Sequence, residues 1–494
     1  MKHFEPNAVS ENKRAKLTHN NYAGYKLTSP NTPLPRLAAL PDAHTFYDDY
    51  VKVRRPVVID TKKGTDTNSF NSTSTAPWYH NFQKWSSNDY LKQVAGHSNV
   101  RVETRAQSGI AYGQGKYDTM AFSSFLDILT DGSTKHYVTT QDAEVDEQGR
   151  PAIMSSPCTE LSHDFPLVPP LVGNLILANV NIWMGNSAAG TSASSSASSS
   201  ASSASSASSA SSASSVDMNG ESVEGTSSGL HHDFHDNLYV LLRGRKRFRL
   251  FSPADAEKLH THGVVERVHP NGRICYVNEL THADGSTEDA RLSILVREEM
   301  EAATVELEAA EESVAKSEQG SAERLAEAEE RMDLAMEASM NFEMGDEEDM
   351  SDDDYQGDTW NGLAMSDQGC RKEAEFEIED AGMAFSENKI TNAENTTPNH
   401  FSRIDMSIEE SIRLKKWPSL RETTMTEVVL NAGDMLYLPA GWFHEVISET
   451  TAENNGHMAF NYWFHPPDGD SVTTPYSSPF WKKDWEDRGK CEGN

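Results

Sequence analysis

The chain has 494 residues, of which 37% are hydrophobic and 24% are charged, and its formal net charge is −33 at pH 7. An acidic balance of this size argues against direct binding to nucleic acid or to anionic membranes, and it favours basic partners. The charge is concentrated in residues 298–380, which hold 29 acidic and 5 basic residues, so the rest of the chain is only mildly acidic.

The cysteines and the amino terminus indicate an intracellular protein. Cys158, Cys275, Cys370 and Cys491 are too scattered for a zinc ribbon or a disulfide framework. The first residues contain no apolar run typical of a signal peptide, and no apolar stretch is long enough to span a membrane. We expect a cytoplasmic protein, and the basic cluster KRAK at 13–16 suggests nuclear entry as an alternative.

Residues 1–30 have the composition of a disordered leader, and residues 31–187 have the pattern of a folded amino-terminal part. Helical spacing leads up to Tyr50, and a second helix is predicted to begin at Ser87 or Asn88. Further segments predict strand, helix, strand and strand in turn, over 99–106, 119–132, 135–142 and 174–185. Short helices thus alternate with strands, as in an α+β lead-in to a larger sheet.

Two insertions interrupt the chain, each with its own composition. Residues 188–224 consist largely of Ser and Ala, which bury too little apolar surface to offset the entropy of ordering, so we expect disorder. Residues 298–386 begin with an Ala-, Glu-, Leu- and Met-rich half that predicts a charged helix or a weak coiled coil. The second half is an acidic low-complexity run.

The remaining segments, 225–297 and 387–467, are rich in short β segments divided by Gly, Pro and Asn. This pattern is typical of a double-stranded β-helix, the jelly-roll or cupin barrel. The predicted fold is therefore mainly β with an α+β lead-in, two inserts, and a carboxy-terminal tail at 468–494.

The stretch LHHDFHD at 230–236 concentrates metal-binding side chains at the start of a strand. Residues two apart on a strand share a face, so His231 and Asp233 can offer an imidazole and a carboxylate to one ion. The segment GDMLYLPAGWFHEV supplies His444 from a second strand. Two histidines and a carboxylate form the facial triad of non-haem Fe(II) oxygenases, which leaves coordination positions open.

A 2-oxo acid that chelates such an iron needs a cation for its distal carboxylate. In LLRGRKRFRLF, taken as a hairpin turned at Arg243 and Gly244, the period of two places Lys246 in an apolar row. A buried lysine is costly unless it is paired, and a bound dicarboxylate would pair it. Asn237, on the same strand face as His231, is placed to add a hydrogen bond.

These motifs together resemble the JmjC (cupin-like) 2-oxoglutarate and Fe(II)-dependent hydroxylases. The likeness covers residues 35–185, 225–295 and 400–467, and within the family the chain is similar to the small JmjC-only protein lysyl hydroxylases. The resemblance implies iron ligation by His231, Asp233 and His444. It also implies that the 2-oxoglutarate pocket contains Lys246, Asn237, Ser228, Tyr137, Asn461 and Trp183. The Ser/Ala insert lies in the loop that leads to His231, so the resemblance does not predict the path of this loop.

Several neighbouring residues have more ordinary interpretations. His232 and His235 are interpreted as structural or pocket-rim groups, and His457 and His465 as groups that pack or face solvent. The arginines between Arg243 and Arg249 are interpreted as an exposed strand face, in preference to a nucleic-acid patch.

The function predicted from the sequence is hydroxylation of a side chain of a protein substrate, with lysine as one target, by Fe(II), 2-oxoglutarate and O2. One alternative is demethylation of histone lysine. Another is a non-catalytic cupin scaffold that binds partners through its acidic insert. A basic protein substrate is one expected partner, and the family resemblance makes a homodimer another.

Overall fold

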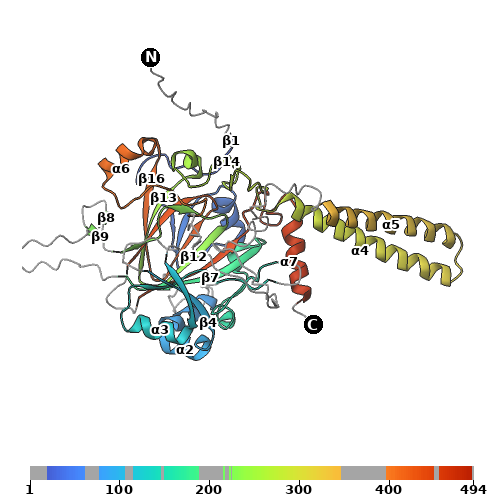
Figure 1. The fold of residues 1–494 in the computed structure, drawn as a ribbon, viewed down its shortest axis with the longest axis horizontal. Helices are drawn as coiled ribbons and strands as arrows, with labels where there is room; N and C mark the ends of the chain where they lie inside the picture. Colours follow the sequence, from blue (N-terminus) through green and yellow to red (C-terminus); the bar gives the residue numbers. More distant parts are fainter. Residues whose placement is uncertain are drawn as a thin grey trace, which may run out of the picture.

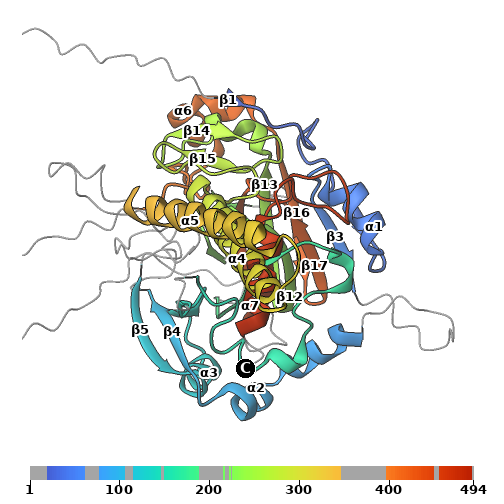
Figure 2. The same cartoon turned by 90° about the vertical axis from the view of Figure 1, so that its right-hand side faces the viewer.

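The computed structural model describes residues 19–61, 77–105, 115–145, 150–187, 215–216, 222–223, 225–345, 397–449 and 456–491. Two β-sheets form the body, helices surround them, and a pair of long helices projects away from the body (Figure 1). The view in Figure 2 places two strands, β4 (Asn99–Thr104) and β5 (Lys116–Ala121), and two helices, α2 (Asn88–Ala95) and α3 (Phe122–Thr130), on one side of the body. On the opposite side lie β1 (His19–Asn20), β14 (Val265–Val268), β15 (Ile274–Tyr276) and α6 (Glu410–Lys416). Within the described residues, no helix is both long and apolar enough to cross a membrane.

The larger sheet has nine strands and extends from the amino-terminal part across the barrel. In spatial order they are β2 (Arg36–Leu37), β3 (Val57–Asp60), β17 (Asp434–Leu438), β12 (Asp236–Arg243), β19 (His457–Phe464), β7 (Leu177–Gly185), β6 (His136–Val138), β4 (Asn99–Thr104) and β5 (Lys116–Ala121). β12 lies between β17 and β19 and pairs antiparallel with both.

The smaller sheet has five strands and carries two of the three predicted metal ligands. Its order is β10 (Thr226–Ser227), β18 (Phe443–Glu449), β13 (Arg245–Phe251) and β16 (Met425–Asn431), and β11 (His231–His232) also pairs with β18. Two short pieces lie apart from it, a three-stranded sheet of β1 (His19–Asn20), β14 (Val265–Val268) and β15 (Ile274–Tyr276), and a pair of β8 (Ser215–Val216) and β9 (Ser222–Val223).

The barrel core lies between the two sheets. One buried apolar cluster joins Leu241 of β12 and Leu436 of β17 to Phe248 and Leu250 of β13. A second and larger cluster packs the outer side of the nine-stranded sheet against the amino-terminal helices. The mainly-β, jelly-roll fold with an α+β lead-in is therefore confirmed.

The helices follow local signals in the sequence. They are α1 (Ala43–Phe46), continued by a π-helical turn (Tyr47–Val51), α2 (Asn88–Ala95), α3 (Phe122–Thr130), α4 (Glu288–Ala315), α5 (Ser321–Gly345), α6 (Glu410–Lys416) and α7 (Phe480–Cys491). The Ser87 hydroxyl accepts a hydrogen bond from the backbone N–H of Tyr90, so Ser87 is the cap of α2.

Three predicted boundaries differ from the structure. Residues 19–30, predicted as leader, are packed, because Tyr22 and Leu27 are buried. The predicted tail contains α7, whose Trp481 is buried beside Ile294 of α4. The first acidic helix, α4, begins at Glu288, before the predicted start of the insert at residue 298, and α5 follows it. Most of the Ser/Ala tract (188–214) and the acidic run at 346–386 lie outside the described residues.

The hairpin predicted around Gly244 is not a hairpin. β12 and β13 belong to different sheets, and Gly244 is the corner at which the chain crosses from one to the other. Its φ of +77° favours glycine, and a Cβ there would lie 2.8 Å from the backbone oxygen of Glu449. The alternation after the corner still holds, because Lys246, Phe248 and Leu250 all face the interior.

Candidate metal centre and cofactor pocket

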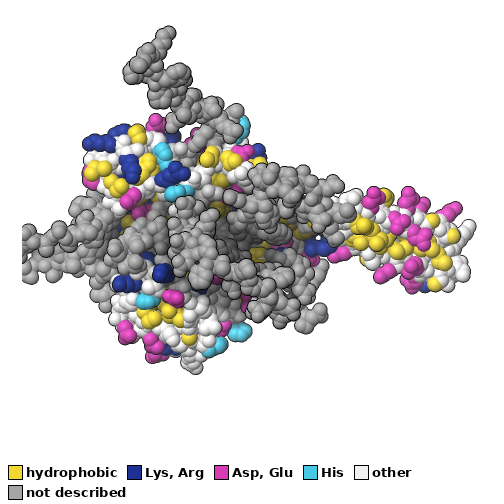
Figure 3. Space-filling model, in the orientation of Figure 1, with side chains coloured by type: hydrophobic (Ala, Val, Ile, Leu, Met, Phe, Trp, Pro, Cys, Tyr) yellow, Lys and Arg dark blue, Asp and Glu magenta, His cyan; other side chains and the backbone are white. Residues whose placement is uncertain are grey.

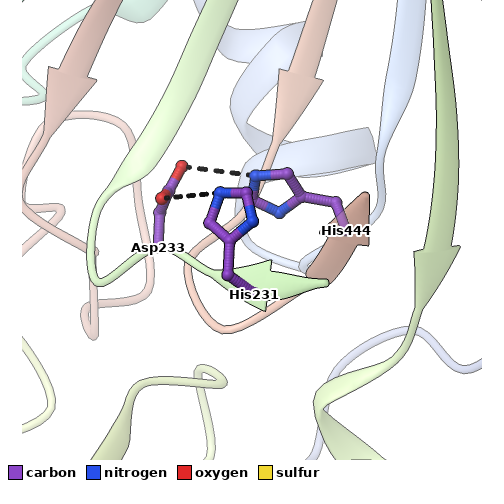
Figure 4. A group of neighbouring side chains, drawn as sticks. All are labelled: His231, Asp233 and His444. Atoms are coloured by element: carbon purple, nitrogen blue, oxygen red, sulfur yellow. Dashed lines mark ion pairs between the residues drawn. The ribbon is translucent and has the colours of Figure 1, made fainter. Parts of the chain in front are cut away.

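The three predicted ligands converge at one end of the barrel. His231 of β11 is the direct antiparallel partner of His444 of β18, and their ring centroids are 4.3 Å apart. Asp233 follows β11, and its Oδ1 and Oδ2 atoms lie 4.0 Å from His231 Nε2 and 3.7 Å from His444 Nε2 (Figure 4). One ligand atom from each residue lies within 4.8 Å of the other two. Two nitrogens and one oxygen can therefore share an ion.

Backbone carbonyls fix which ring nitrogens are free to bind. His231 Nδ1 lies 3.0 Å from the oxygen of Gly229, and His444 Nδ1 lies 2.9 Å from the oxygen of Trp442. A carbonyl oxygen only accepts, so each Nδ1 carries the hydrogen and each Nε2 keeps its lone pair. Burial, with His444 close by, lowers the pKa of His231 to about 4, which keeps this ring neutral at pH 7.

A chain of side-chain amides holds the carboxylate. Trp183 Nε1 donates to Asn461 Oδ1 (3.0 Å), and Asn461 Nδ2 donates to Asn237 Oδ1 (3.2 Å). Asn237 Nδ2 then points at Asp233 Oδ2 (3.4 Å). Each side chain in this hydrogen-bonded series has a defined donor or acceptor role. The series therefore orients the Asp233 carboxylate from the nine-stranded sheet.

A buried ion pair connects the two segments that bear ligands. Arg54 Nη1 donates to Asp236 Oδ2 (2.9 Å), and the second nitrogen, Nη2, contacts Oδ1. The same carboxylate accepts from the Tyr437 hydroxyl (2.6 Å) and from the backbone N–H of Ala440 (2.9 Å). Because Asp236 begins β12 and Ala440 precedes β18, this carboxylate ties Asp233's segment to His444's segment.

The buried Lys246 lies on the inner face of β13, as does Leu250, the residue opposite the predicted ligand His444. Leu250 pairs with His444 in the β13–β18 register, and Lys246 is four residues away, roughly 13 Å along the strand. Lys246 is 1% exposed, and its Nζ donates to Ser448 Oγ at 2.5 Å. Burial, with Arg105 nearby, lowers its pKa to about 7. The Ser448 hydroxyl is neutral and the nearby Arg105 is cationic, so an anionic ligand would complete this environment.

The chain matches a cupin-like domain family over residues 43–470. It is also 30% identical over 457 residues to JmjC domain-containing protein 4 of Schizosaccharomyces pombe. The aligned residues cover 86% of this chain and 82% of that protein. The chain belongs to the cupin-like JmjC family. This family generally includes oxygenases that depend on Fe(II) and 2-oxoglutarate, which supports placing the chain in that superfamily.

The donor set fits the metal that the JmjC family uses. Two imidazoles and one carboxylate match the ligand types that non-haem Fe(II) takes, and in the described part of the chain this is the one such group of three. Several residues named for the cofactor pocket also gather here. Asn461 and Trp183 reach Asp233 through Asn237, whereas Ser228 accepts from the backbone N–H of Val446.

Two details of the predicted JmjC site are corrected. His231 and Asp233 do not lie on one strand, because β11 ends at His232 and Asp233 turns into the connection to β12. Asn237 is consequently in the other sheet, and it approaches the carboxylate from across the barrel. His232 is structural, since its Nε2 lies 2.7 Å from the Tyr276 hydroxyl.

The arginine row of β13 is not an exposed face. Arg247 and Arg249 are each 6% exposed. Arg247 Nη1 lies 2.9 Å from Glu427 Oε1, and Arg249 Nη1 lies 3.0 Å from Glu445 Oε2. Cross-strand glutamates on β16 and β18 thus neutralise the row and cover it, which alternation alone does not reveal.

Sequence reasoning did not place Phe401, Arg105 or His457 beside the JmjC site. Phe401 stacks on the His231 ring with centroids 4.9 Å apart. It lies just beyond the acidic insert, so only the fold shows this proximity. The Arg105 cation helps to lower the pKa of Lys246, and Lys246 and Arg105 both help to lower the pKa of His457. The Tyr137 ring lies 5.9 Å from the Arg105 guanidinium carbon and 5.8 Å from the His457 ring. His457 and His465 are both buried, which fits the packing interpretation.

Proposed function

We propose that this chain is a 2-oxoglutarate and Fe(II)-dependent dioxygenase that hydroxylates a side chain of a protein substrate, with lysine as one target. The observation that carries the proposal is the combination of the His231–Asp233–His444 triad with a buried ammonium on the same inner face. A catalytically inert cupin scaffold would have no need for a lysine held in this costly environment.

Each group has a defined task in this proposal. Fe(II) with 2-oxoglutarate and O2 supplies the oxidation of an unactivated C–H bond, with release of succinate and CO2. His231 and His444 would bind the iron through Nε2, and Asp233 through a carboxylate oxygen. Lys246 would hold the distal carboxylate of 2-oxoglutarate, and Ser448 keeps the ammonium in place. The Phe401 ring shields one face of His231 from water.

The decisive experiment measures binding and turnover of 2-oxoglutarate by the full chain. We expect the Fe(II)-loaded wild type to bind 2-oxoglutarate and to release succinate, and His231→Ala to do neither. His97→Ala, which changes an exposed histidine away from the site, serves as the matched control. A folded, iron-loaded wild type without binding or turnover would favour the scaffold alternative.

The substrate class needs a separate measurement. Mass spectrometry of proteins trapped by His231→Ala, after treatment with the active enzyme, should show additions of one oxygen atom to a side chain. Loss of methyl groups from lysine in the same experiment would instead support the demethylase alternative.

A further inference from the structure

The α4–α5 hairpin, which the proposed catalysis does not use, projects from the body as an antiparallel helix pair (Figure 1). At its base, α4 packs on α7, where Arg297 pairs with Asp487 and Ile294 contacts Trp481. Beyond this base, the helices meet along a seam of small buried residues. The seam consists of Ala303, Ala310, Ser313, Ala328 and Ala335.

The two flanks of this seam differ in chemistry. On α5, Arg331 is three residues and Met332 four residues after the seam residue Ala328, so their side chains lie on opposite sides of the seam. Arg331 pairs with Glu299 (2.7 Å) and Glu306 (2.5 Å) of α4, so this side is an ion-pair face.

The other side is apolar and has no partner among the described residues. Glu306 lies on the ion-pair face, so its neighbour Leu307 lies on the same side as Met332. The helical spacing adds further members to this side, which we call the methionine face: Met300, Leu307, Val314, Leu325, Met332, Met336 and Met340. The exposed fractions of Met336 and Met340 are 50% and 57%, high for apolar side chains on a helix already packed on another.

Carboxylates border the methionine face on both edges. The helical spacing places Glu308 and Glu311 on the α4 edge, and Glu329 and Asp333 on the α5 edge, and all four are exposed. Both arginines of α5, Arg324 and Arg331, lie on the ion-pair face instead. Figure 3 shows apolar side chains along the hairpin with acidic ones beside them.

We propose that the methionine face is a docking site for a basic amphipathic helix of a partner protein, which would complete a three-helix bundle. Flexible methionine side chains adapt to varied apolar partners, and the acidic edges select a helix whose polar flanks carry Lys or Arg. A second copy of the chain would bring like-charged edges together. The chain that follows α5, 346–380, is also strongly acidic, so charge does not favour it as the occupant.

The test uses the full chain and a fluorescent 18-residue Leu/Lys peptide of amphipathic pattern as the probe. Fluorescence anisotropy should show saturable binding. A scrambled peptide of the same composition, which keeps the charge but loses the apolar stripe, should bind at least tenfold more weakly. Equal binding of the two peptides would overturn the proposal, because charge alone would explain it.

Variants locate the binding surface. Met336→Gln with Met340→Gln should weaken peptide binding at least tenfold, whereas Val305→Gln with Leu334→Gln, on exposed apolar positions outside the face, should change it less than twofold. Equal losses in both pairs would contradict the proposal. Light scattering tests whether a second copy of the chain occupies the methionine face instead. A wild-type dimer that the methionine variants dissociate would assign the face to a second copy and overturn the proposal.

Discussion

The affinity for 2-oxoglutarate should fall as the pH rises through 7, because the Lys246 ammonium is lost there. Burial lowers the pKa of this lysine to about 7, so the charged form is present below that pH and disappears above it. The charged fraction falls from about 0.9 at pH 6 to about 0.1 at pH 8. If only the ammonium form holds the distal carboxylate, the apparent Kd rises about tenfold over this interval. His457 stays neutral throughout, because burial holds its pKa well below 6.5.

Isothermal titration of 2-oxoglutarate into the Mn(II)-substituted protein measures this directly. Lys246→Met should weaken binding by about thirtyfold or more at pH 6, the effect of ~2 kcal/mol for removing one partner of a buried charge pair. The remaining affinity should no longer vary between pH 6 and 8. Lys482→Met, on a largely exposed side chain of α7, should keep the wild-type profile. A wild-type affinity equal at pH 6 and 8, or a Lys246→Met protein that binds normally, would refute the assignment of the pocket.

Three further predictions address the frame of the site. Asn237→Leu removes the donor to Asp233 and should lower Mn(II) affinity about ten- to hundredfold in calorimetry, and unchanged affinity would mean that the amide chain does not position the ligand. Arg54→Met leaves the Asp236 carboxylate buried without its cation and should lower the free energy of unfolding in urea by about 3–5 kcal/mol, whereas a loss below ~1 kcal/mol would show that the pair contributes little. Burial holds the pKa of His465 well below 6.5, so the folded protein keeps this ring neutral while the unfolded chain protonates it below pH 6.5. The free energy of unfolding should therefore fall by about 1.4 kcal/mol per pH unit below pH 6.5. His465→Gln should reduce this slope, and an unchanged slope would contradict burial of His465 as its cause.

The sequence was most informative where chemistry and period coincide. His231, Asp233 and His444 could be named because the His-x-Asp pair, the distal histidine segment and Lys246 agree with one another, and the inward side of Lys246 follows from a period of two. The sequence did not show which strands share a sheet. Gly244 was therefore interpreted as a hairpin turn, and the glutamates opposite Arg247 and Arg249 stayed hidden, because cross-strand pairing is a long-range property.

The contacts made by segments flanking the inserts could not be predicted either. Phe401 reaches His231 only because the chain returns to β11 after the acidic insert, where Ser402 N–H donates to the oxygen of Leu230. The composition of the insert predicts that its first half, which contains most of α4 and all of α5, is helical. Its division into an ion-pair face and a methionine face depends on how the two helices align, which the seam alanines set.

The place where the Ser/Ala tract joins the barrel has a consequence for how this protein can vary between species. Ser187, before the tract, and Thr226, after it, have hydroxyl oxygens 3.3 Å apart, so the chain leaves the barrel and returns at one point. The composition of the tract predicts a disordered segment, and doubling the length of such a segment between fixed ends changes its closure free energy by only about 0.6 kcal/mol. Repeat expansion or loss in this tract should therefore be nearly neutral for folding, and the same junction offers a site at which a foreign domain could be grafted.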